Sequence, residues 1–255
     1  MRLNNKVCVI TGGAQGMGAL ACSLFAKEGA RVVAADLAQE PGEKLVSRIR
    51  AEGEEAIFVK TDISREEDCA RLIETAVKTF GGLDVLYNNA GIFPPDDHSV
   101  INTPAEVWER VFKVNLMGVV FCSKFGIPEL VKRGGGSVIN IASFTALLGC
   151  TVPQDAYASS KGAVIALTKS MAVQFGPKKV RSNVICPGPI ETPMITEWLL
   201  TNPVERNKRL PRIPLDRFGR PQDVVYMALH LASDESAWTN GAVVVIDGGI
   251  TSNYF

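Results

Sequence analysis

The stretch KVCVITGGAQGMG, residues 6–18, passes from an apolar run through a glycine-rich turn into a helical pattern. Glycines at positions 12, 16 and 18 let the backbone turn tightly and approach a ligand without a Cβ in the way. The helix that follows presents free N–H groups and a positive dipole end, which suit a pyrophosphate. The glycine spacing differs from the G-x-G-x-x-G fingerprint. A glycine-rich strand–helix turn that binds no ligand would show the same sequence pattern. The rest of the chain therefore has to supply the context.

The same alternation of short apolar runs and longer amphipathic segments continues along the chain. Near-continuous Val/Ile-rich strands are typical of a parallel sheet that is covered on both faces. The expected strands are 6–10, 31–36, 56–60, 84–88, 137–142, 180–186 and 242–247. The expected helices are 16–28, 41–52, 65–79, 104–132, 155–175 and 221–233. We predict an α/β fold with a doubly wound, seven-stranded parallel sheet, in one domain over residues 1–255.

One segment, residues 187–220, breaks this alternation. It is rich in proline and charge, and its only helical pattern is a short one near 194–200. A long insertion after the carboxyl end of a strand is where a binding lid is usually found. We therefore expect this segment to be a substrate-binding insertion.

The overall composition is that of an ordinary globular protein. The chain is 46% apolar and 21% charged, and its 27 basic residues balance 27 acidic ones. Without a broad basic field, neither nucleic acid nor an anionic membrane is an expected partner. The longest uncharged run, 134–154, is broken by polar residues and proline, so it reads as strand and loop. The run VCVI appears within the first ten residues without a signal-peptide layout, so we expect a cytoplasmic protein.

Cysteine and histidine usage narrows the chemistry. The six cysteines lie far apart with no CxxC pair, which favours reduced, mostly buried thiols. With only two histidines, a histidine-built zinc site or a Ser-His-Asp triad is nearly excluded. We therefore predict no metal site.

An acidic residue ends the second strand. Asp36 lies eighteen residues beyond Gly18, where a carboxylate can accept a hydrogen bond from an adenosine ribose 2′-hydroxyl. A 2′-phosphate would meet like charge there, and neither Gln15 nor Leu37 provides a compensating cation. The pattern favours NAD(H) over NADP(H). Taken alone, Asp36 would read equally as a residue of the turn after the strand.

Polar residues also end three further strands. Asp62 follows the third strand, where it can serve a ligand or cap the next helix. NNAG (88–91) ends the fourth, and PGPIET (187–192) follows the sixth. The alternative for NNAG is a loop whose polar groups are satisfied by one another. Because ligands bind at the carboxyl ends of strands in open α/β sheets, their clustering indicates a binding edge.

The motif YASSK, residues 157–161, opens the helix expected at 155–175. Its spacing places Tyr157 and Lys161 on one helical face, about 6 Å apart along the axis. An ammonium about 4 Å from the phenol would favour the phenolate by roughly 4 kcal/mol at a dielectric of about 20, nearly three pKa units. We therefore expect Lys161 to lower the pKa of Tyr157 toward neutrality, with an amphipathic surface pair as the alternative. Asp155, or the residue before it, is the expected helix cap.

Two other polar residues point to the same chemistry. Ser143 ends the fifth strand and can hold a substrate oxygen beside Tyr157. Asn115 interrupts a helical pattern that asparagine disfavours. A kink with a bound water would let Asn115 link Lys161 to solvent protons. A buried asparagine satisfied by the backbone is an equally good interpretation.

These motifs occur together and in order, ending with VIDGG (245–249), and the whole sequence resembles the short-chain dehydrogenase/reductase family. The combination is specific, although YxxxK alone is not. The resemblance implies a Rossmann fold and a catalytic tetrad of Asn115, Ser143, Tyr157 and Lys161. In that tetrad Tyr157 transfers the proton, while Lys161 also binds the nicotinamide ribose.

The resemblance also implies a set of contacts to NAD. They are Gly12, Gly16, Met17 and Gly18 at the pyrophosphate, Asp36 and Leu37 at the adenosine ribose, Asp62 and Ile63 at the adenine, Asn89, Ala90 and Gly91 at the ribose, and Ile190 and Thr192 at the carboxamide. Homotetramers are common in the family, assembled through two long helices and the C-terminal strand. The expected helices 104–132 and 155–175 and the tail SNYF (252–255) are the candidates here.

The leading hypothesis is an NAD-dependent oxidoreductase that interconverts a secondary alcohol and a ketone. The expected pocket wall is mostly apolar, which favours a hydrophobic or cyclic substrate. It comprises residues 93–95, Phe144, 147–150 and 194–200. The alternative is that some of these residues pack into the core or into subunit contacts. A 3-oxoacyl thioester reductase is one alternative. A non-catalytic NAD-binding scaffold is another, but such a protein has no need of both Tyr157 and Lys161.

Overall fold

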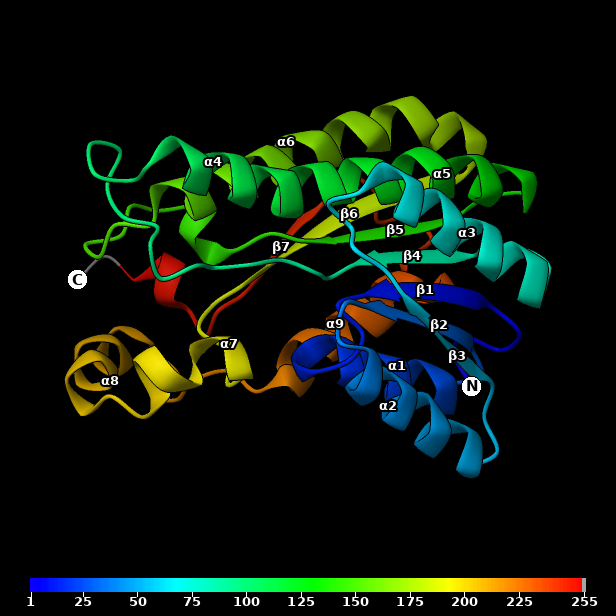
Figure 1. Ribbon diagram of the computed structural model, residues 1–255, viewed down its shortest axis with the longest axis horizontal. Coiled ribbons are helices and arrows are strands. Elements are labelled where there is room, and N and C mark those ends of the chain that lie inside the picture. Colours follow the sequence, from blue (N-terminus) through cyan, green and yellow to red (C-terminus); the bar gives the residue numbers. More distant parts are fainter. Residues whose placement is uncertain (254–255) are drawn as a thin grey trace.

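A computed structural model of the protein describes residues 1–253, with residues 197 and 198 described by their backbone alone (Figure 1). Within them, seven parallel strands form one sheet in the order β3-β2-β1-β4-β5-β6-β7. The strands are β1 (Val7–Thr11), β2 (Arg31–Asp36), β3 (Ala56–Lys60), β4 (Val85–Asn88), β5 (Gly136–Ile141), β6 (Val180–Pro187) and β7 (Val243–Ile246). The predicted doubly wound parallel sheet is confirmed.

The sheet reverses its winding at β1. All five residues of β1, VCVIT, are buried, as expected of a strand with neighbours on both sides and helices on both faces. It pairs with β2 on one side and with β4 on the other. This switch point is where open α/β sheets bind ligands.

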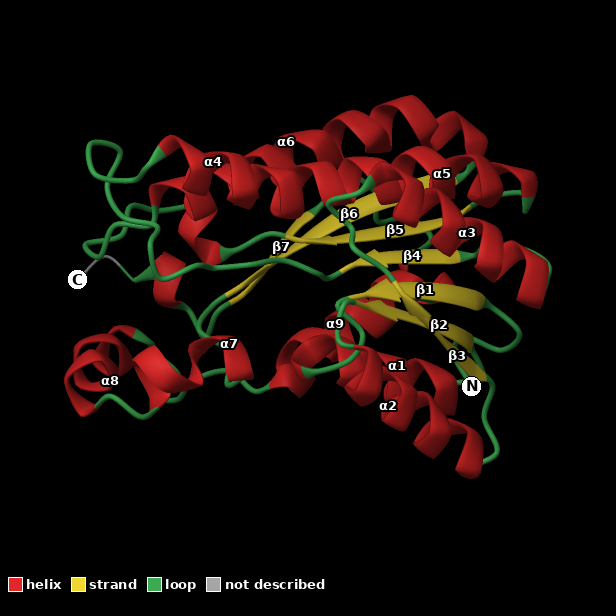
Figure 2. Cartoon of the chain, in the orientation of Figure 1, coloured by secondary structure: helices red, strands yellow, loops and turns green. Residues whose placement is uncertain are grey.

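Helices cover both faces of the sheet (Figure 2). One layer holds α1 (Gly16–Lys27), α2 (Gln39–Ala51) and α9 (Pro221–Ala232). The other holds α3 (Glu66–Phe80), α4 (Ala105–Phe112), α5 (Gly118–Lys132) and α6 (Asp155–Phe175). Each layer packs its apolar face on the sheet, with Phe25 and Leu229 in one core and Leu72 and Leu130 in the other.

A π-helical turn, Lys113–Met117, joins α4 to α5 in one continuous helix. By length and composition alone, the helix Ala105–Lys132 could cross a membrane. Its apolar residues have another use, because Cys122, Ile127 and Leu130 of α5 are buried against the sheet and α3. The apolar character of this helix is thus accounted for by its place in the layer.

The insertion after β6 is more helical than the sequence predicted. The short pattern near 194–200 becomes α7 (Pro193–Ile195) and a π-helical turn, Thr196–Leu200. A further helix, α8 (Pro203–Arg209), was not predicted. It begins with proline at its first position, and the Asn202 side chain accepts hydrogen bonds from two of its N–H groups. The start signal, Asn202 followed by Pro203, is hard to recognise in the sequence because the residues after it are mostly charged.

The insertion also has an apolar core of its own. Leu199 is 1% exposed and packs with Ile213 and Phe218. Leu199, expected in the substrate pocket wall, thus contributes to the core of the insertion, which is the alternative considered for part of that wall. The side chain of Trp198, expected in the same wall, lies outside the described residues, as do the last two residues of the tail SNYF.

Candidate active site

The glycine turn and the NNAG motif form one hydrogen-bonded unit at the switch point. The Thr11 hydroxyl, at the end of β1, accepts the backbone N–H groups of Asn89 and Ala90, each at 3.1 Å. In return, the Asn89 side-chain amide donates to the carbonyl oxygens of Thr11 at 3.0 Å and Gly12 at 3.3 Å. From the sequence, Thr11 has no role of its own beyond its place in the glycine motif. In the structure it joins the carboxyl ends of the neighbouring strands β1 and β4.

Positive φ angles or close backbone contacts disfavour side chains at Gly12, Gly16 and Gly18. Gly12 and Gly16 have φ angles of +65° and +55°, in the region that favours glycine. A Cβ on Gly18 would lie 1.9 Å from the carbonyl oxygen of Gly12. A Cβ on Gly16 would lie 3.7 Å from the Thr192 methyl group, so the PGPIET segment borders the same turn.

Asp36 holds the turn from the end of β2. One carboxylate oxygen accepts the N–H of Ala14 and the other that of Ala38, both at 3.0 Å. Each oxygen retains a lone pair for a further donor, such as a ribose hydroxyl. Leu37 beside it is 61% exposed and leaves the approach open.

Asp62 lies at the end of β3 but does not cap the next helix. Its carboxylate accepts the N–H of Ser64 at 2.9 Å, whereas α3 begins four residues later behind Arg65. The capping role considered for Asp62 is therefore wrong. Ile63 is buried at the edge of the core of that layer, with 9% of its surface exposed.

A dinucleotide fits these residues. The dense glycine turn offers free N–H groups at the start of α1, where acidic side chains are absent from the first turn. The side-chain oxygen of Asn89 is buried and has no hydrogen-bond partner within the described chain. A buried acceptor of this kind is costly unless a ligand or water supplies a donor.

Tyr157, Lys161 and Asn115 converge near Gly91. The Lys161 nitrogen lies 5.7 Å from the centre of the Tyr157 ring and donates to the carbonyl oxygen of Ile141 at 2.9 Å. A Cβ on Gly91 would lie 3.2 Å from both the Lys161 nitrogen and the Asn115 side-chain oxygen. The helix, the π-helical turn and the NNAG loop thus meet at one point.

The pKa of Tyr157 moves in the direction opposite to the sequence expectation. Burial raises it to about 12, a hydrogen bond with Ser143 lowers it in part, and the Cys186 thiol adds to the rise. Burial also lowers the pKa of Lys161 to about 8. The expectation counted the attraction between the pair and omitted the desolvation of both groups, which dominates in the protein alone.

Ser143 follows β5 and is 4% exposed. Its hydroxyl oxygen accepts hydrogen bonds from the Thr145 N–H at 3.2 Å and the Thr145 hydroxyl at 2.9 Å. These contacts leave its own proton available, and its hydrogen bond with Tyr157 favours the phenolate.

Asn115 is fully buried in the π-helical turn. Its side-chain oxygen accepts the N–H of Ile92 at 2.8 Å, and its amide donates to the carbonyl oxygen of Ile92 at 3.0 Å and to the Ser160 hydroxyl at 3.1 Å. The interpretation as an asparagine satisfied by the backbone describes these contacts. The proton-relay role stays a prediction.

The expected cap of α6 is wrong. Gln154, which precedes the helix, makes no capping hydrogen bond with its side chain, and the carboxylate of Asp155 accepts the N–H of Val100. The cap comes instead from Asp97, a residue that the sequence did not single out. Its carboxylate accepts the N–H groups of Ala156 and Tyr157. The pair of aspartates after PP (94–95) was the available signal, but no local pattern shows which helix they reach.

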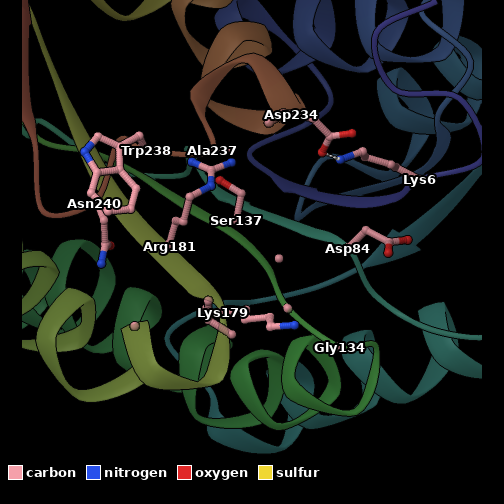
Figure 3. A pocket seen from close by; sticks show the side chains of 15 residues that line it. Lys6, Asp84, Gly134, Ser137, Lys179, Arg181, Asp234, Ala237, Trp238 and Asn240 are labelled. Atoms are coloured by element: carbon pink, nitrogen blue, oxygen red, sulfur yellow. Dashed lines mark hydrogen bonds and ion pairs between the residues drawn. The ribbon is translucent and has the colours of Figure 1, made fainter.

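A cavity of about 680 Å³ lies at the amino ends of the strands, away from these residues (Figure 3). Four of its five charged side chains already have partners: Lys6 pairs with Asp234, Asp84 with Arg133, and Arg181 donates to three backbone carbonyl oxygens, which leaves Lys179 as the fifth. We assign no ligand to it. Within the described residues, no group of three His, Cys, Asp or Glu side chains could hold a metal ion.

Comparisons with known proteins agree with this fold. The family model described as enoyl-(acyl carrier protein) reductase matches residues 12–251. The chain is 39% identical to the 3-oxoacyl-(acyl-carrier-protein) reductase FabG of Thermotoga maritima, over 98% of this chain and 99% of that protein. It is 37% identical to the cyclopentanol dehydrogenase of Comamonas testosteroni, over 99% of each.

Solved structures give the same answer. A short-chain type dehydrogenase/reductase from Mycobacterium marinum superposes with a TM-score of 0.90 at 30% identity, covering 98% of this chain and 96% of that one. The protein is an oxidoreductase with a site for a nicotinamide cofactor. The chain belongs to the short-chain dehydrogenase/reductase family, as its motifs implied.

Proposed function

We propose that the protein is an NAD(H)-dependent oxidoreductase that interconverts a secondary alcohol and a ketone, with Tyr157 as general acid/base. The observation that carries the proposal is the meeting of Tyr157, Ser143 and Lys161 beside a turn that fits a dinucleotide. When bound, the nicotinamide accepts or supplies the hydride. The residues of the chain hold the substrate oxygen and move its proton.

In the reducing direction, the neutral phenol of Tyr157 donates its proton to the carbonyl oxygen. Burial keeps that proton in place, because it raises the pKa of Tyr157 to about 12. Ser143 orients the same substrate oxygen by hydrogen bonding. Lys161, with a pKa of about 8, carries a positive charge below that pH and favours the developing phenolate.

One apolar residue beside Tyr157, and two exposed apolar residues of the expected pocket wall, support a hydrophobic or cyclic substrate. The Phe93 ring meets the Tyr157 ring edge-on, with 5.1 Å between centroids. Leu147 and Met194 are 42% and 47% exposed, which leaves apolar surface for a ligand. Relatives with such substrates in their names include the cyclopentanol dehydrogenase and a 2,5-dichloro-2,5-cyclohexadiene-1,4-diol dehydrogenase of Sphingobium indicum, 38% identical to this chain.

The second candidate is reduction of a 3-oxoacyl thioester. The 39% identity to the Thermotoga maritima FabG favours it. The same proton transfer by Tyr157 would serve this substrate, since it also presents a ketone. The two candidates differ in what the insertion must accommodate beyond the reacting carbon.

The test is a substrate panel followed by absorbance of the reduced cofactor. Cyclic and linear secondary alcohols are assayed with NAD⁺, and acetoacetyl-CoA with NADH. Turnover of alcohols alone supports the leading proposal, and turnover of the thioester alone supports the second. Tyr157→Phe should abolish turnover of either substrate while NADH binding, followed by fluorescence, persists. Unchanged turnover in that variant would remove the proposed mechanism.

We further propose a cytoplasmic homotetramer without nucleic-acid or membrane partners. A cavity of about 540 Å³ runs between α5 and α6, and its lining is largely apolar. The apolar residues are Val120, Ile127, Pro128, Val131, Leu167, Met171 and Phe175. A second subunit would cover this surface, and light scattering after gel filtration measures the mass that decides it.

A further inference from the structure

The helix that carries Tyr157 has no cap of its own. The first turn of any helix leaves N–H groups without intrahelical acceptors. In α6 two of them are satisfied from another part of the chain: the N–H of Ala156 donates to one oxygen of Asp97 at 3.1 Å, and that of Tyr157 donates to the other at 2.8 Å. The backbone of the proposed acid/base is therefore held by a side chain sixty residues away.

Asp97 is a buried carboxylate. It is 4% exposed, and among the described residues it forms no ion pair with a lysine or arginine. A buried carboxylate is costly without compensation. The N–H groups and positive end of α6 provide that compensation, so the helix and the carboxylate stabilise each other.

The loop that carries Asp97 touches the proposed site at two further points. Ile92 exchanges both of its backbone hydrogen bonds with the Asn115 side chain, and Phe93 packs against the Tyr157 ring. Past Asp97, the carbonyl oxygen of His98 accepts the N–H of Asp155 at 3.1 Å. The segment 92–98 is thus tied to the π-helical turn at Ile92 and to α6 at Phe93, Asp97 and His98.

We propose that Asp97 is a positioning residue: it fixes the start of α6, and through the N–H of Tyr157 the place of the phenol, from the loop that borders the substrate. The inference rests on the proposed role of Tyr157. It goes beyond that role because it makes catalysis depend on a carboxylate that touches neither cofactor nor substrate.

Two substitutions grade the effect. Asp97→Asn keeps the side-chain volume and one acceptor oxygen, whereas Asp97→Ala removes both acceptor oxygens. Because misplacing a catalytic group by about 1 Å can cost about 100-fold in rate, we expect kcat to fall roughly 10-fold in the first variant and roughly 100-fold in the second. The KM for the substrate and the Kd for NADH should stay within about twofold.

The matched control is Asp96→Asn. Asp96 is the neighbouring carboxylate on the same loop, is exposed, and pairs with Arg110. This variant should keep the kcat of the wild type. All rates are measured well below each variant's Tm, so that loss of folded protein does not enter kcat.

A second readout separates positioning from stability. With NADH deuterated at the transferred position, the primary isotope effect on kcat should rise in Asp97→Asn, because a misplaced phenol slows the chemical step. In the wild type, the amides of Ala156 and Tyr157 should exchange with solvent as slowly as that of Ala158. Fast exchange at these two amides would contradict the cap even if no variant folded.

The outcomes separate this inference from the proposed function. If Tyr157→Phe is inactive while both Asp97 variants turn over like the wild type with a lowered Tm, Asp97 is a structural residue only and the inference is overturned. If Tyr157→Phe remains active, the proposed function fails first.

Discussion

The Lys161 amine approaches the Tyr157 ring to 5.7 Å from its centre while its proton is donated to a backbone carbonyl. Lys161 is buried and Tyr157 is partly buried, and desolvation disfavours the charged form of each: it raises the pKa of the phenol and lowers the pKa of the amine. A bound cofactor with a positive nicotinamide would shift this balance toward the phenolate. Alcohol oxidation and ketone reduction should therefore differ in their dependence on pH.

Alcohol oxidation is expected to speed up as the pH rises. Its base is the Tyr157 phenolate, and below the phenol's pKa the phenolate fraction grows about tenfold per pH unit. Lys161, Ser143 and Cys186 are the groups that face Tyr157, and Lys161 loses its charge above a pKa of about 8, which flattens the rise there. Ketone reduction, which uses the phenol itself, should show no such increase. Initial rates in both directions from pH 6 to 10 check this, and an oxidation rate independent of pH would contradict it.

Lys161→Met should change the pH dependence of stability. Burial lowers the pKa of Lys161 from 10.5 to about 8, so the unfolded chain binds more protons between these values. The amine therefore destabilises the fold below about pH 8, and this penalty disappears as the pH rises toward 10.5. The difference in free energy of unfolding between the methionine variant and the wild type should fall by roughly 2 kcal/mol between pH 7 and pH 10.

Urea unfolding at the two pH values measures that difference, and titrations common to both proteins cancel in it. A constant difference would mean that the amine titrates alike in the folded and unfolded chains. Lys161→Met should also lose most of its turnover at pH 7.

Gly18→Ala should break the cofactor turn. Its Cβ would lie 1.9 Å from the Gly12 carbonyl oxygen, a contact that only a movement of the turn can relieve. We expect at least tenfold weaker NADH binding and a lower Tm. Gly162→Ala is the matched control, since that glycine lies inside α6 with no heavy atom within 4 Å of the added Cβ. Replacing a helix-interior glycine in open space should raise stability by up to about 1 kcal/mol.

Leu37→Arg tests the preference for NAD(H). Leu37 is exposed beside Asp36, so the change adds a cation at the expected ribose position without disturbing the core. We expect the wild type to have a kcat/KM for NADH at least tenfold above that for NADPH, about 1.4 kcal/mol. In Leu37→Arg, the arginine should attract the 2′-phosphate of NADPH and so lower the ratio of the two kcat/KM values. A wild-type protein that prefers NADPH would contradict the proposal that Asp36 selects NAD(H).

The sequence predicted those parts of the protein that are written in local patterns. The strands and most helices follow from hydrophobic periodicity, and the glycine turn follows from three glycines after β1. The role of Asp97 could not be predicted, because its partners lie sixty residues away and only the folded chain brings them together. The pKa of Tyr157 was predicted with the wrong sign, since burial is a property of the packed site. The helix α8 was overlooked because its charged residues resemble a loop.

The anchoring of the insertion has a consequence for biosynthesis. The backbone N–H of Leu215 donates to the carbonyl oxygen of Gly248, and Gly249 lies against Pro214. Chains fold progressively as they leave the ribosome. The insertion therefore cannot reach its final packing until residues 248 and 249 have been synthesised. Premature termination before these residues would leave the insertion without both contacts.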